Sequence, residues 1–220
     1  INHIEVQPLG PISNTVEMGE NIGHVITKLQ RSARYRNLFG SDEINSQNML
    51  KAMAQFMGML YSYNSKYDQV KKSGAQQSFT GSEFHGYQLF LTNCNGCHKE
   101  PLFSDFQFRS NGLKVNPALN DSGRAHITGL STDKFKFKTP SLRNIALTAP
   151  YMHDGRFENL DSVLNYYTRA FENTQNLDAL LPVGGFQFSA TDKKDIINFF
   201  KTLSDTALIN NTRFKDPKHF

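Results

Sequence analysis

The two cysteines of this 220-residue chain lie three positions apart and are followed at once by a histidine, in the sequence Cys94-Asn95-Gly96-Cys97-His98. A Cys-x-x-Cys-His sequence attaches haem c: the two thiols add across the vinyl groups of the porphyrin, and the adjacent histidine ligates the iron. We therefore predict that Cys94 and Cys97 bind a covalent haem c and that His98 is its proximal ligand.

Three other uses of the cysteine pair fit the sequence less well. A thioredoxin-like dithiol site requires a βαβ context, which the flanking residues lack. A zinc site needs four ligands, and Cys94, Cys97 and one distant histidine supply only three. A disulfide that spans only two residues is rare as a stabilising crosslink.

Because covalent haem attachment takes place on the oxidising side of a membrane, the pattern predicts a periplasmic location.

The composition is that of an ordinary folded protein. Apolar residues make up 38% of the chain and aromatic residues 12%, which is enough to form a core. The 24 basic and 20 acidic residues give a net charge of +4, and the densest basic run, residues 134–138, is too short to indicate nucleic-acid binding. The sequence contains no run of about 18 or more apolar residues, the length needed to span a membrane, and no signal peptide is visible. Since the first residue is not Met, we expect that upstream residues were removed or that the sequence is a fragment.

Hydrophobic periodicity predicts a mainly α fold without alternating strand runs. Helices are expected over residues 18–32, 44–62, 81–92, 160–171 and 190–203. Polar residues that can act as N-caps precede the last three of these, at Thr80, Asn159 and Ser189. The side chains expected to face inward are Met49, Met53, Phe56, Leu60, Phe84, Tyr87, Phe90 or Leu91, Leu160, Val163, Leu164, Tyr167, Phe171, Ile196, Phe200 and Leu203.

The rest of the chain lacks such periodicity. Residues 1–16 and 64–80 are expected to be irregular, and the tail from Ser204 is expected to be polar and extended. A stretch as long as residues 99–158 without clear helix or strand would normally argue against a compact domain. A porphyrin changes this expectation because it is itself a large apolar element around which loops can wrap.

A low-spin electron-transfer haem needs a second axial ligand, and the sequence leaves the choice open. Met152 is one candidate, because methionine ligation is a common way to raise a haem potential. Tyr167 is another, because a phenol on the inward face of a helix must find a partner, although a backbone carbonyl would satisfy it too. His153 is a third, although a hydrogen-bonded loop histidine explains it better. Composition and periodicity alone favour Met152.

Several separated motifs resemble, in the same order, those of a known family. The sequences "GYQLFLTNCNGCH" (86–98) and "FKTPSLRNIALTAPYMHDGRFENLDSVLNYY" (137–167) resemble the C-terminal haem domain of bacterial di-haem cytochrome c peroxidases, and more closely that of their MauG-like relatives. The sequence "EVQPLGPISNTVEMGE" (5–20) resembles the segment that joins the two haem domains of that family. The resemblance covers about residues 5–203.

The resemblance implies a division of the chain and a role for it. Residues 1–75 would be an interdomain segment with helices that complete the peroxidase architecture. Residues 76–205 would form a cytochrome c-like haem domain with long loops around a covalent haem, and residues 206–220 a polar tail. Such proteins carry one haem that reacts with hydrogen peroxide and a second that receives electrons. Only the second is encoded here, so another haem c is expected upstream of Ile1.

Further implications concern activity and partners. Peroxidase activity is expected only in the longer di-haem protein, because a six-coordinate haem in the isolated chain offers peroxide no open site. The implied electron donor is a small protein of the cytochrome c or cupredoxin type. Because members of the family often dimerise, a homodimer is a candidate assembly. Neither nucleic acid nor a membrane span is implied.

The resemblance also bears on the axial ligand. Classical peroxidases have a methionine fourteen residues after the histidine of the "HDG" motif, whereas MauG-like enzymes have a tyrosine there. That position is Tyr167 in this chain, so the resemblance favours Tyr167 as the sixth ligand and makes Met152 its neighbour. An anionic phenolate stabilises oxidised iron and lowers the potential, and a thioether does the reverse.

Four other residues match functional positions of the family. Gln7 and Glu17 match polar residues above the peroxide-binding haem, where a carboxylate can shuttle a proton of the peroxide. Without the resemblance, Glu17 would be interpreted as a first-turn helix carboxylate that faces the positive end of the helix dipole. Thr148 and Pro150 match positions whose backbone carbonyls bind a calcium ion between the domains, and carbonyl oxygens suit such a hard cation.

A free-standing mono-haem c-type cytochrome that only carries electrons is the competing hypothesis. It predicts methionine ligation, a native N-terminus near Ile1 and no use for Gln7 or Glu17. A zinc-binding or dithiol redox module is a weaker third hypothesis.

Overall fold

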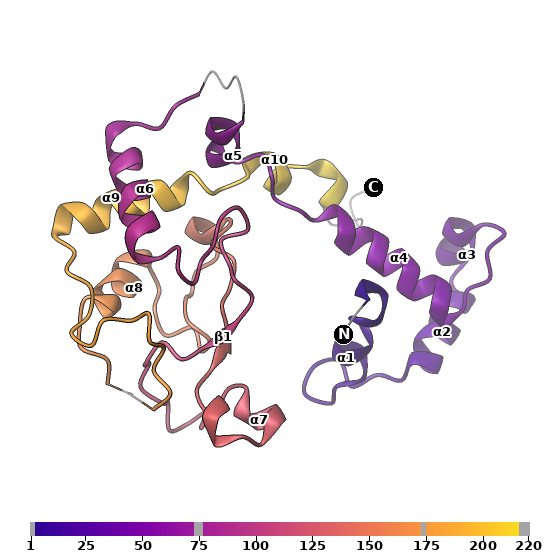
Figure 1. The fold of residues 1–220 in the computed structure, drawn as a ribbon. Coiled ribbons are helices and arrows are strands. Elements are labelled where there is room, and N and C mark those ends of the chain that lie inside the picture. Colours follow the sequence, from indigo (N-terminus) through magenta and orange to yellow (C-terminus); the bar gives the residue numbers. More distant parts are fainter. Residues whose placement is uncertain (1–2, 73–76, 173–174, 216–220) are drawn as a thin grey trace. The chain divides into compact units, whose positions relative to one another are not determined.

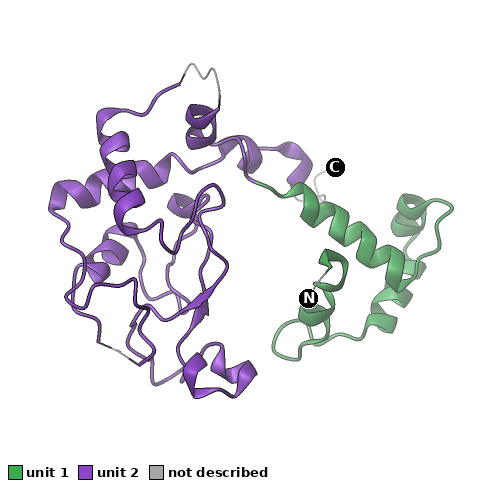
Figure 2. Ribbon diagram, viewed as in Figure 1, with its two compact units in different colours: residues 1–61 green, residues 62–220 purple. Residues whose placement is uncertain are grey.

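The computed structural model describes residues 3–72, 77–172 and 175–215. The chain forms two compact units, residues 1–61 and 62–220 (Figure 2). The division lies before the boundary expected at residues 75 and 76, because helix α5 (Lys66–Lys71) belongs to the second unit, where its Tyr67 side chain is part of the core. Within the described ranges, no helix is both long and apolar enough to cross a bilayer.

The first unit consists of short helices (Figure 1). They are η1 (Ile4–Val6), α1 (Leu9–Ser13), α2 (Ile22–Arg31), α3 (Ala33–Phe39) and α4 (Ser46–Met59). Helix α2 begins later than the expected residue 18, because the side chain of Asn21 caps it by accepting a hydrogen bond from the backbone N–H of Gly23 at 2.8 Å. Asn45 caps α4 in the same way, close to its expected start.

The expected apolar stripe of α4 is wrong for three of its four residues. Met49 is buried, but Met53, Phe56 and Leu60 are 37%, 46% and 45% exposed. The buried face of α4 instead contains Met49 and Ala54, and the helix packs against η1 and α2. The residue spacing therefore predicted the helix correctly but not the face that is buried.

Two helices cross at close range in the second unit. Both α6 (Gly81–Asn93) and α9 (Ala190–Lys201) begin with a capping box, at Thr80–Glu83 and Ser189–Asp192, as the sequence predicts. A β-carbon added at Gly86 of α6 would lie 2.0 Å from the backbone oxygen of Asp195 in α9. The backbones can approach this closely only because position 86 has no side chain.

Aromatic rings fill the core around this crossing. The ring of the fully buried Phe199 lies 5.2 Å, between centroids, from the rings of both Phe90 and Tyr87. The sequence analysis overlooked Phe199, and Phe84, which was expected to face inward, is 54% exposed. The buried core of the second unit comprises Tyr67, Tyr87, Phe90, Phe103, Leu142, Tyr151, Leu160, Leu164, Ile196, Phe199, Phe200 and Leu203.

Residues 99–158 consist mainly of loops and turns, as their lack of periodicity predicts. Their short elements are β1 (Phe108–Arg109), α7 (Ala125–Thr128), η2 (Ser131–Asp133), β2 (Phe137–Lys138) and η3 (Ile145–Leu147). The two strands pair antiparallel, with Phe108 opposite Lys138. Helix α8 (Leu160–Tyr167) follows its Asn159 cap as expected but ends before the expected Phe171.

Two segments that were expected to lack helices contain them. In the polar stretch 64–80, α5 begins at a capping box formed by Ser65 and Asp68. Beyond residue 204, α10 (Thr206–Ile209) and η4 (Thr212–Phe214) replace the expected extended tail. The buried Asp205 accounts for α10, because its carboxylate caps that helix and also accepts a hydrogen bond from the backbone N–H of Asn64 at 2.9 Å.

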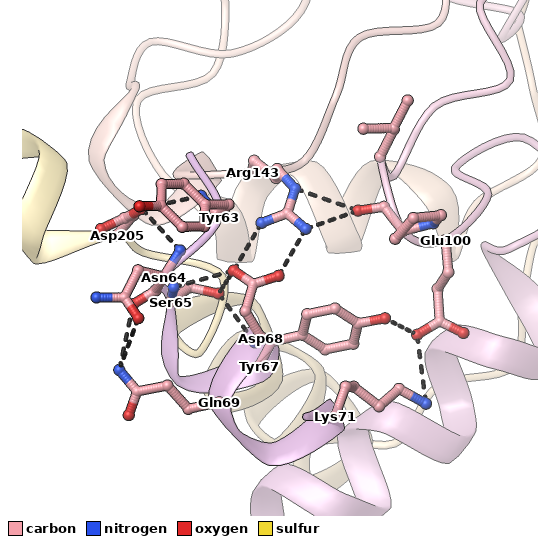
Figure 3. Close-up of polar contacts among 12 residues, drawn as sticks. Tyr63, Asn64, Ser65, Tyr67, Asp68, Gln69, Lys71, Glu100, Arg143 and Asp205 are labelled. Atoms are coloured by element: carbon pink, nitrogen blue, oxygen red, sulfur yellow. Dashed lines mark hydrogen bonds and ion pairs between the residues drawn. The ribbon is translucent and has the colours of Figure 1, made fainter. Parts of the chain in front are cut away.

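A polar network joins α5 to the loop that follows the cysteine-histidine motif (Figure 3). Arg143 donates two hydrogen bonds to the Asp68 carboxylate, at 2.7 and 2.8 Å, and another to the backbone oxygen of Pro101 at 2.8 Å. The hydroxyl of Tyr67 donates to the carboxylate of Glu100 at 2.5 Å. Because Glu100 and Pro101 lie two and three residues after His98, this network anchors the backbone close to that histidine.

Replacing Gly86 with alanine tests the close crossing of α6 and α9. The new methyl group would collide with the backbone oxygen of Asp195, so we expect the free energy of unfolding to fall by about 1–3 kcal/mol, the usual cost of overpacking. Chemical denaturation followed by circular dichroism measures the change. Gly81→Ala in the same helix is the matched control, because no atom lies within 4 Å of its β-carbon position. If both variants lowered the free energy of unfolding equally, the helix crossing would be ruled out as the cause of the destabilisation.

Replacing Arg143 with methionine tests the ion pair with Asp68. Burial disfavours the Asp68 carboxylate, but hydrogen bonds from Arg143 and Ser65 outweigh burial and lower its pKa from the usual 3.8. A lowered carboxyl pKa stabilises the fold above about pH 4, and this contribution is lost as the pH falls through the folded-state value. We expect Arg143→Met to lower the free energy of unfolding by about 2 kcal/mol at neutral pH and by less at about pH 3. Chemical denaturation at both pH values measures the difference.

The control for this variant is Lys114→Met, which removes an exposed ion pair with Glu172, 3.7 Å long. Exposed pairs contribute little, so its free energy of unfolding should change by less than about 1 kcal/mol at either pH. If Arg143→Met lowered the free energy of unfolding by the same amount at both pH values, the result would contradict a role for Asp68 ionisation.

Candidate haem site

One cavity brings the predicted site residues together. It has a volume of about 420 Å³ and is lined by Cys94, Cys97, His98, Met152 and Tyr167. This volume lies within the range of about 300–1,000 Å³ that is typical of ligand and cofactor sites. The cavity is also lined by the apolar side chains of Leu142, Leu160, Val163, Leu164, Phe186 and Phe188. An apolar cavity with two thiols and an imidazole fits a covalently bound porphyrin.

The C-terminal end of α6 presents the two cysteines. Cys94 is the C-cap residue, and its backbone N–H donates to the backbone oxygen of Phe90 at 2.8 Å. The backbone N–H groups of Cys97 and His98 both donate to the oxygen of Cys94, at 3.2 and 2.9 Å, and form a tight turn. The cysteines are partly buried and form no disulfide, so both thiols line the cavity as the haem attachment requires.

The chemistry around these thiols favours neither a dithiol redox site nor a zinc site. Burial raises the pKa of Cys94 to about 12, with a further contribution from Cys97, and burial also raises the pKa of Cys97. Reactive dithiol sites depend on the opposite shift, because the thiolate is the nucleophile. Across the described ranges, no three His, Cys, Asp or Glu side chains lie close enough to hold a metal ion together, so no zinc ligand set is present there.

The backbone holds the imidazole of His98 from two sides. Its Nδ1 lies 3.2 Å from the backbone oxygen of Phe103 and 3.1 Å from that of Pro140. Because carbonyl oxygens only accept hydrogen bonds, Nδ1 carries the hydrogen and Nε2 keeps its lone pair. Burial also lowers the pKa of His98, which favours the neutral ring. A neutral imidazole whose outer nitrogen is fixed by a backbone carbonyl is the form that ligates metals.

The two candidate axial ligands meet at the side chain of Asn111. Its Nδ2 lies 3.5 Å from Sδ of Met152 and 3.4 Å from Oη of Tyr167. Met152 lies in a turn with a φ of +72°, and Tyr167 is the last residue of α8. Burial raises the pKa of Tyr167, and the hydrogen bond from Asn111 opposes this effect. The structure thus places both candidates at one cavity wall, in contact with the same amide.

Three other predicted residues also line this cavity. Thr148 and Pro150 are exposed residues at its edge, and the binding of calcium by their carbonyl oxygens stays a prediction. The ring of His153 stacks on Phe137, with 3.8 Å between ring centroids and 11° between planes. Whether His153 ligates iron or is a hydrogen-bonded loop histidine stays a prediction, because this contact is a stacked ring pair.

Gln7 and Glu17 lie in the first unit, and both are exposed. Gln7 ends η1. Glu17 lies in a turn and accepts a hydrogen bond from Nδ2 of Asn14 at 2.9 Å. Because α2 begins only at Ile22, the interpretation of Glu17 as a first-turn helix carboxylate was wrong. The role of both residues at a second haem stays a prediction.

Among the polar residues of the cavity that the sequence analysis missed are Asn111 and Arg109. Arg109 donates to Asp105 at 2.9 Å from Nε and to Asp178 at 2.6 Å from a terminal nitrogen, and the backbone N–H of Asp105 donates to the oxygen of Cys97 at 2.8 Å. These contacts connect the motif to Asp178, another residue of the cavity lining. Both of these residues, Asn111 and Arg109, lie in a stretch without periodicity, where a turn-forming asparagine was the only local signal.

Comparisons with known proteins identify the family. A family model described as di-haem cytochrome c peroxidase matches residues 1–76. The chain is 31% identical over 209 residues to the methylamine utilization protein MauG of Methylorubrum extorquens, and 31% identical over 211 residues to the cytochrome c551 peroxidase of Nitrosomonas europaea. Each alignment covers 91% of this chain and 58% of the relative, so the chain spans somewhat more than half the length of these curated relatives.

A solved structure gives the same result. The crystal structure of a MauG-like protein associated with microbial copper homeostasis matches with a TM-score of 0.84 and 30% sequence identity, over 98% of this chain and 73% of that chain. This match confirms the mainly α fold class. The sequence motifs and the comparisons agree with one another. The chain therefore belongs to the di-haem cytochrome c peroxidase/MauG-like family.

Proposed function

We propose that this chain is the C-terminal, electron-transfer haem c portion of a periplasmic di-haem peroxidase of the MauG-like type. One observation carries the proposal: a single cavity is lined by both cysteines, by a histidine with its Nδ1 bonded to the backbone, and by two possible axial donors. Cys94 and Cys97 would hold the haem covalently, and Nε2 of His98 would ligate its iron. When bound, haem c supplies reversible one-electron chemistry.

Tyr167 is the sixth ligand in this proposal. The family resemblance assigns a tyrosine to this position, and one observation supports it: an amide N–H of Asn111 is available to stabilise the phenol oxygen. Tyr167 and His98 would then hold both axial positions with side chains of this chain. Peroxide would have no open site here, so its reduction would require a second haem c upstream, and the isolated chain would be inactive.

The remaining roles follow from the family resemblance. Hydrogen peroxide would be the substrate, and a small cytochrome c or cupredoxin would be the electron donor. Gln7 and Glu17 would serve the second haem, where the Glu17 carboxylate could move a proton of the peroxide. The carbonyl oxygens of Thr148 and Pro150 would bind a calcium ion. Covalent haem attachment supports the periplasmic location.

Haem content tests the di-haem proposal. We expect the protein purified from its native source to contain two covalently bound haems on a chain well above 24.9 kDa, measured by haem assay and intact mass. Replacing Cys94 and Cys97 with alanine in that full-length protein should lower the covalent haem count from two to one. One haem on a 220-residue chain would instead favour the mono-haem electron carrier, and an unchanged count in the double variant would place the attachment elsewhere.

Axial-ligand substitutions in the full-length protein test the role of Tyr167. We expect Tyr167→Phe to change the ferric absorption spectrum and raise the reduction potential of one haem, because loss of a phenolate removes stabilisation of oxidised iron. Met152→Leu should leave both properties nearly unchanged. Tyr151→Phe is the matched control, since Tyr151 also lines the cavity but donates its hydroxyl to the backbone oxygen of Ile145 at 2.8 Å. A spectrum that responds only to Met152→Leu would assign the ligand to methionine.

A further inference from the structure

The side-chain amide of Asn111 contacts both residues that could act as the sixth ligand. Its Nδ2 lies within hydrogen-bond distance of Oη of Tyr167, at 3.4 Å, and of Sδ of Met152, at 3.5 Å. An amide nitrogen carries two hydrogens, so one can be directed at each acceptor. Asn111 is therefore placed to act on both donor atoms at once.

Two further contacts fix the orientation of Asn111. Its Oδ1 accepts a hydrogen bond from the backbone N–H of Leu113 at 3.3 Å, and its backbone oxygen accepts one from the hydroxyl of Tyr166 at 2.8 Å. Rotating the amide by half a turn would bring its NH₂ group against the N–H of Leu113, which is also a donor, and would place its oxygen against the sulfur of Met152. The two N–H groups are thus kept toward Met152 and Tyr167.

The two hydrogen bonds have opposite effects on ligation. A thioether sulfur stays neutral, so an N–H directed at it withdraws electron density from the atom that would bind iron and stabilises no negative charge, even though a second lone pair remains. An N–H directed at a phenol oxygen stabilises negative charge on that oxygen, which a ferric ion also requires, and leaves another lone pair available. Both effects disfavour the thioether relative to the phenol oxygen.

We propose that Asn111 is a positioning residue that selects Tyr167 over Met152 as the sixth ligand of the haem. Asn111 does not itself bind the iron, and acts only through the two side chains that it contacts. The inference rests on the proposed function, because it concerns the haem that this function assigns to the cavity. In the proposed function only Tyr167 ligates the iron, and the contacts of Asn111 give a physical reason for that choice.

The test uses the full-length holo-protein with Asn111→Leu, which removes both N–H donors at similar side-chain volume. We expect a weak absorption band of thioether-ligated ferric haem to appear near the red end of the spectrum, where the unmodified protein has none. The reduction potential of that haem should rise in parallel. Asn111→Asp is the second variant: it lacks the NH₂ group, keeps an oxygen that accepts from Leu113, and adds a negative charge that disfavours a phenolate at Tyr167, so the same change is expected with less disturbance of the loop.

Two controls make the outcomes distinct. Adding Met152→Leu to either Asn111 variant should abolish the new band, and a band that persists would overturn the inference. Unchanged spectra in both Asn111 variants would also overturn it, and would leave the proposed function intact if Tyr167→Phe still changes the spectrum. A thioether band that is already present before any substitution would contradict both the selection by Asn111 and the ligation by Tyr167.

Discussion

The close crossing of α6 and α9 is the constraint on which the haem site depends. Because Gly86 lets the backbones approach, α6 is held firmly against the aromatic core, and its C-terminal end has a defined position. Cys94 caps that end, and the turn through His98 follows from two hydrogen bonds to the Cys94 carbonyl. The positions of both thiols and of the imidazole therefore follow from the packing of two helices.

The remaining walls of the cavity are held by individual polar contacts rather than by repeating ladders. The carbonyl oxygens that fix Nδ1 of His98 belong to Phe103 and Pro140, in two separate loops. The buried hydroxyl of Ser104 joins these loops by donating to the backbone oxygen of Thr139 at 2.7 Å. Arg143 joins the same region to α5. Such side-chain hydrogen bonds satisfy polar groups around the cavity, where repeating secondary structure is sparse.

The sequence predicted those features that depend on local signals. The capping boxes of α6 and α9 and the cap of α8 start each helix where expected, and Cys94, Cys97 and His98 form a recognisable motif. Features that depend on distant partners were not predictable. The face of α4 that is buried depends on η1 and α2, the capping of α10 by Asp205 depends on tertiary burial, and nothing near Asn111 in the sequence indicates that its amide meets residues 152 and 167.

The helix crossing and the loop contacts differ in how much substitution they tolerate, and this affects how the site can vary within one fold. The helix crossing tolerates little change, because any side chain at position 86 meets backbone atoms. Hydrogen bonds such as those of Asn111 contribute only about 1 kcal/mol each to stability, so a substitution there can alter the cavity without unfolding the chain. Ligand identity, in contrast, changes a haem potential strongly, because phenolate and thioether favour opposite oxidation states. A fold that positions the Cys94–His98 turn through helix packing, but Met152 and Tyr167 through single side-chain contacts, could therefore change the redox properties of the proposed haem while its architecture stays the same.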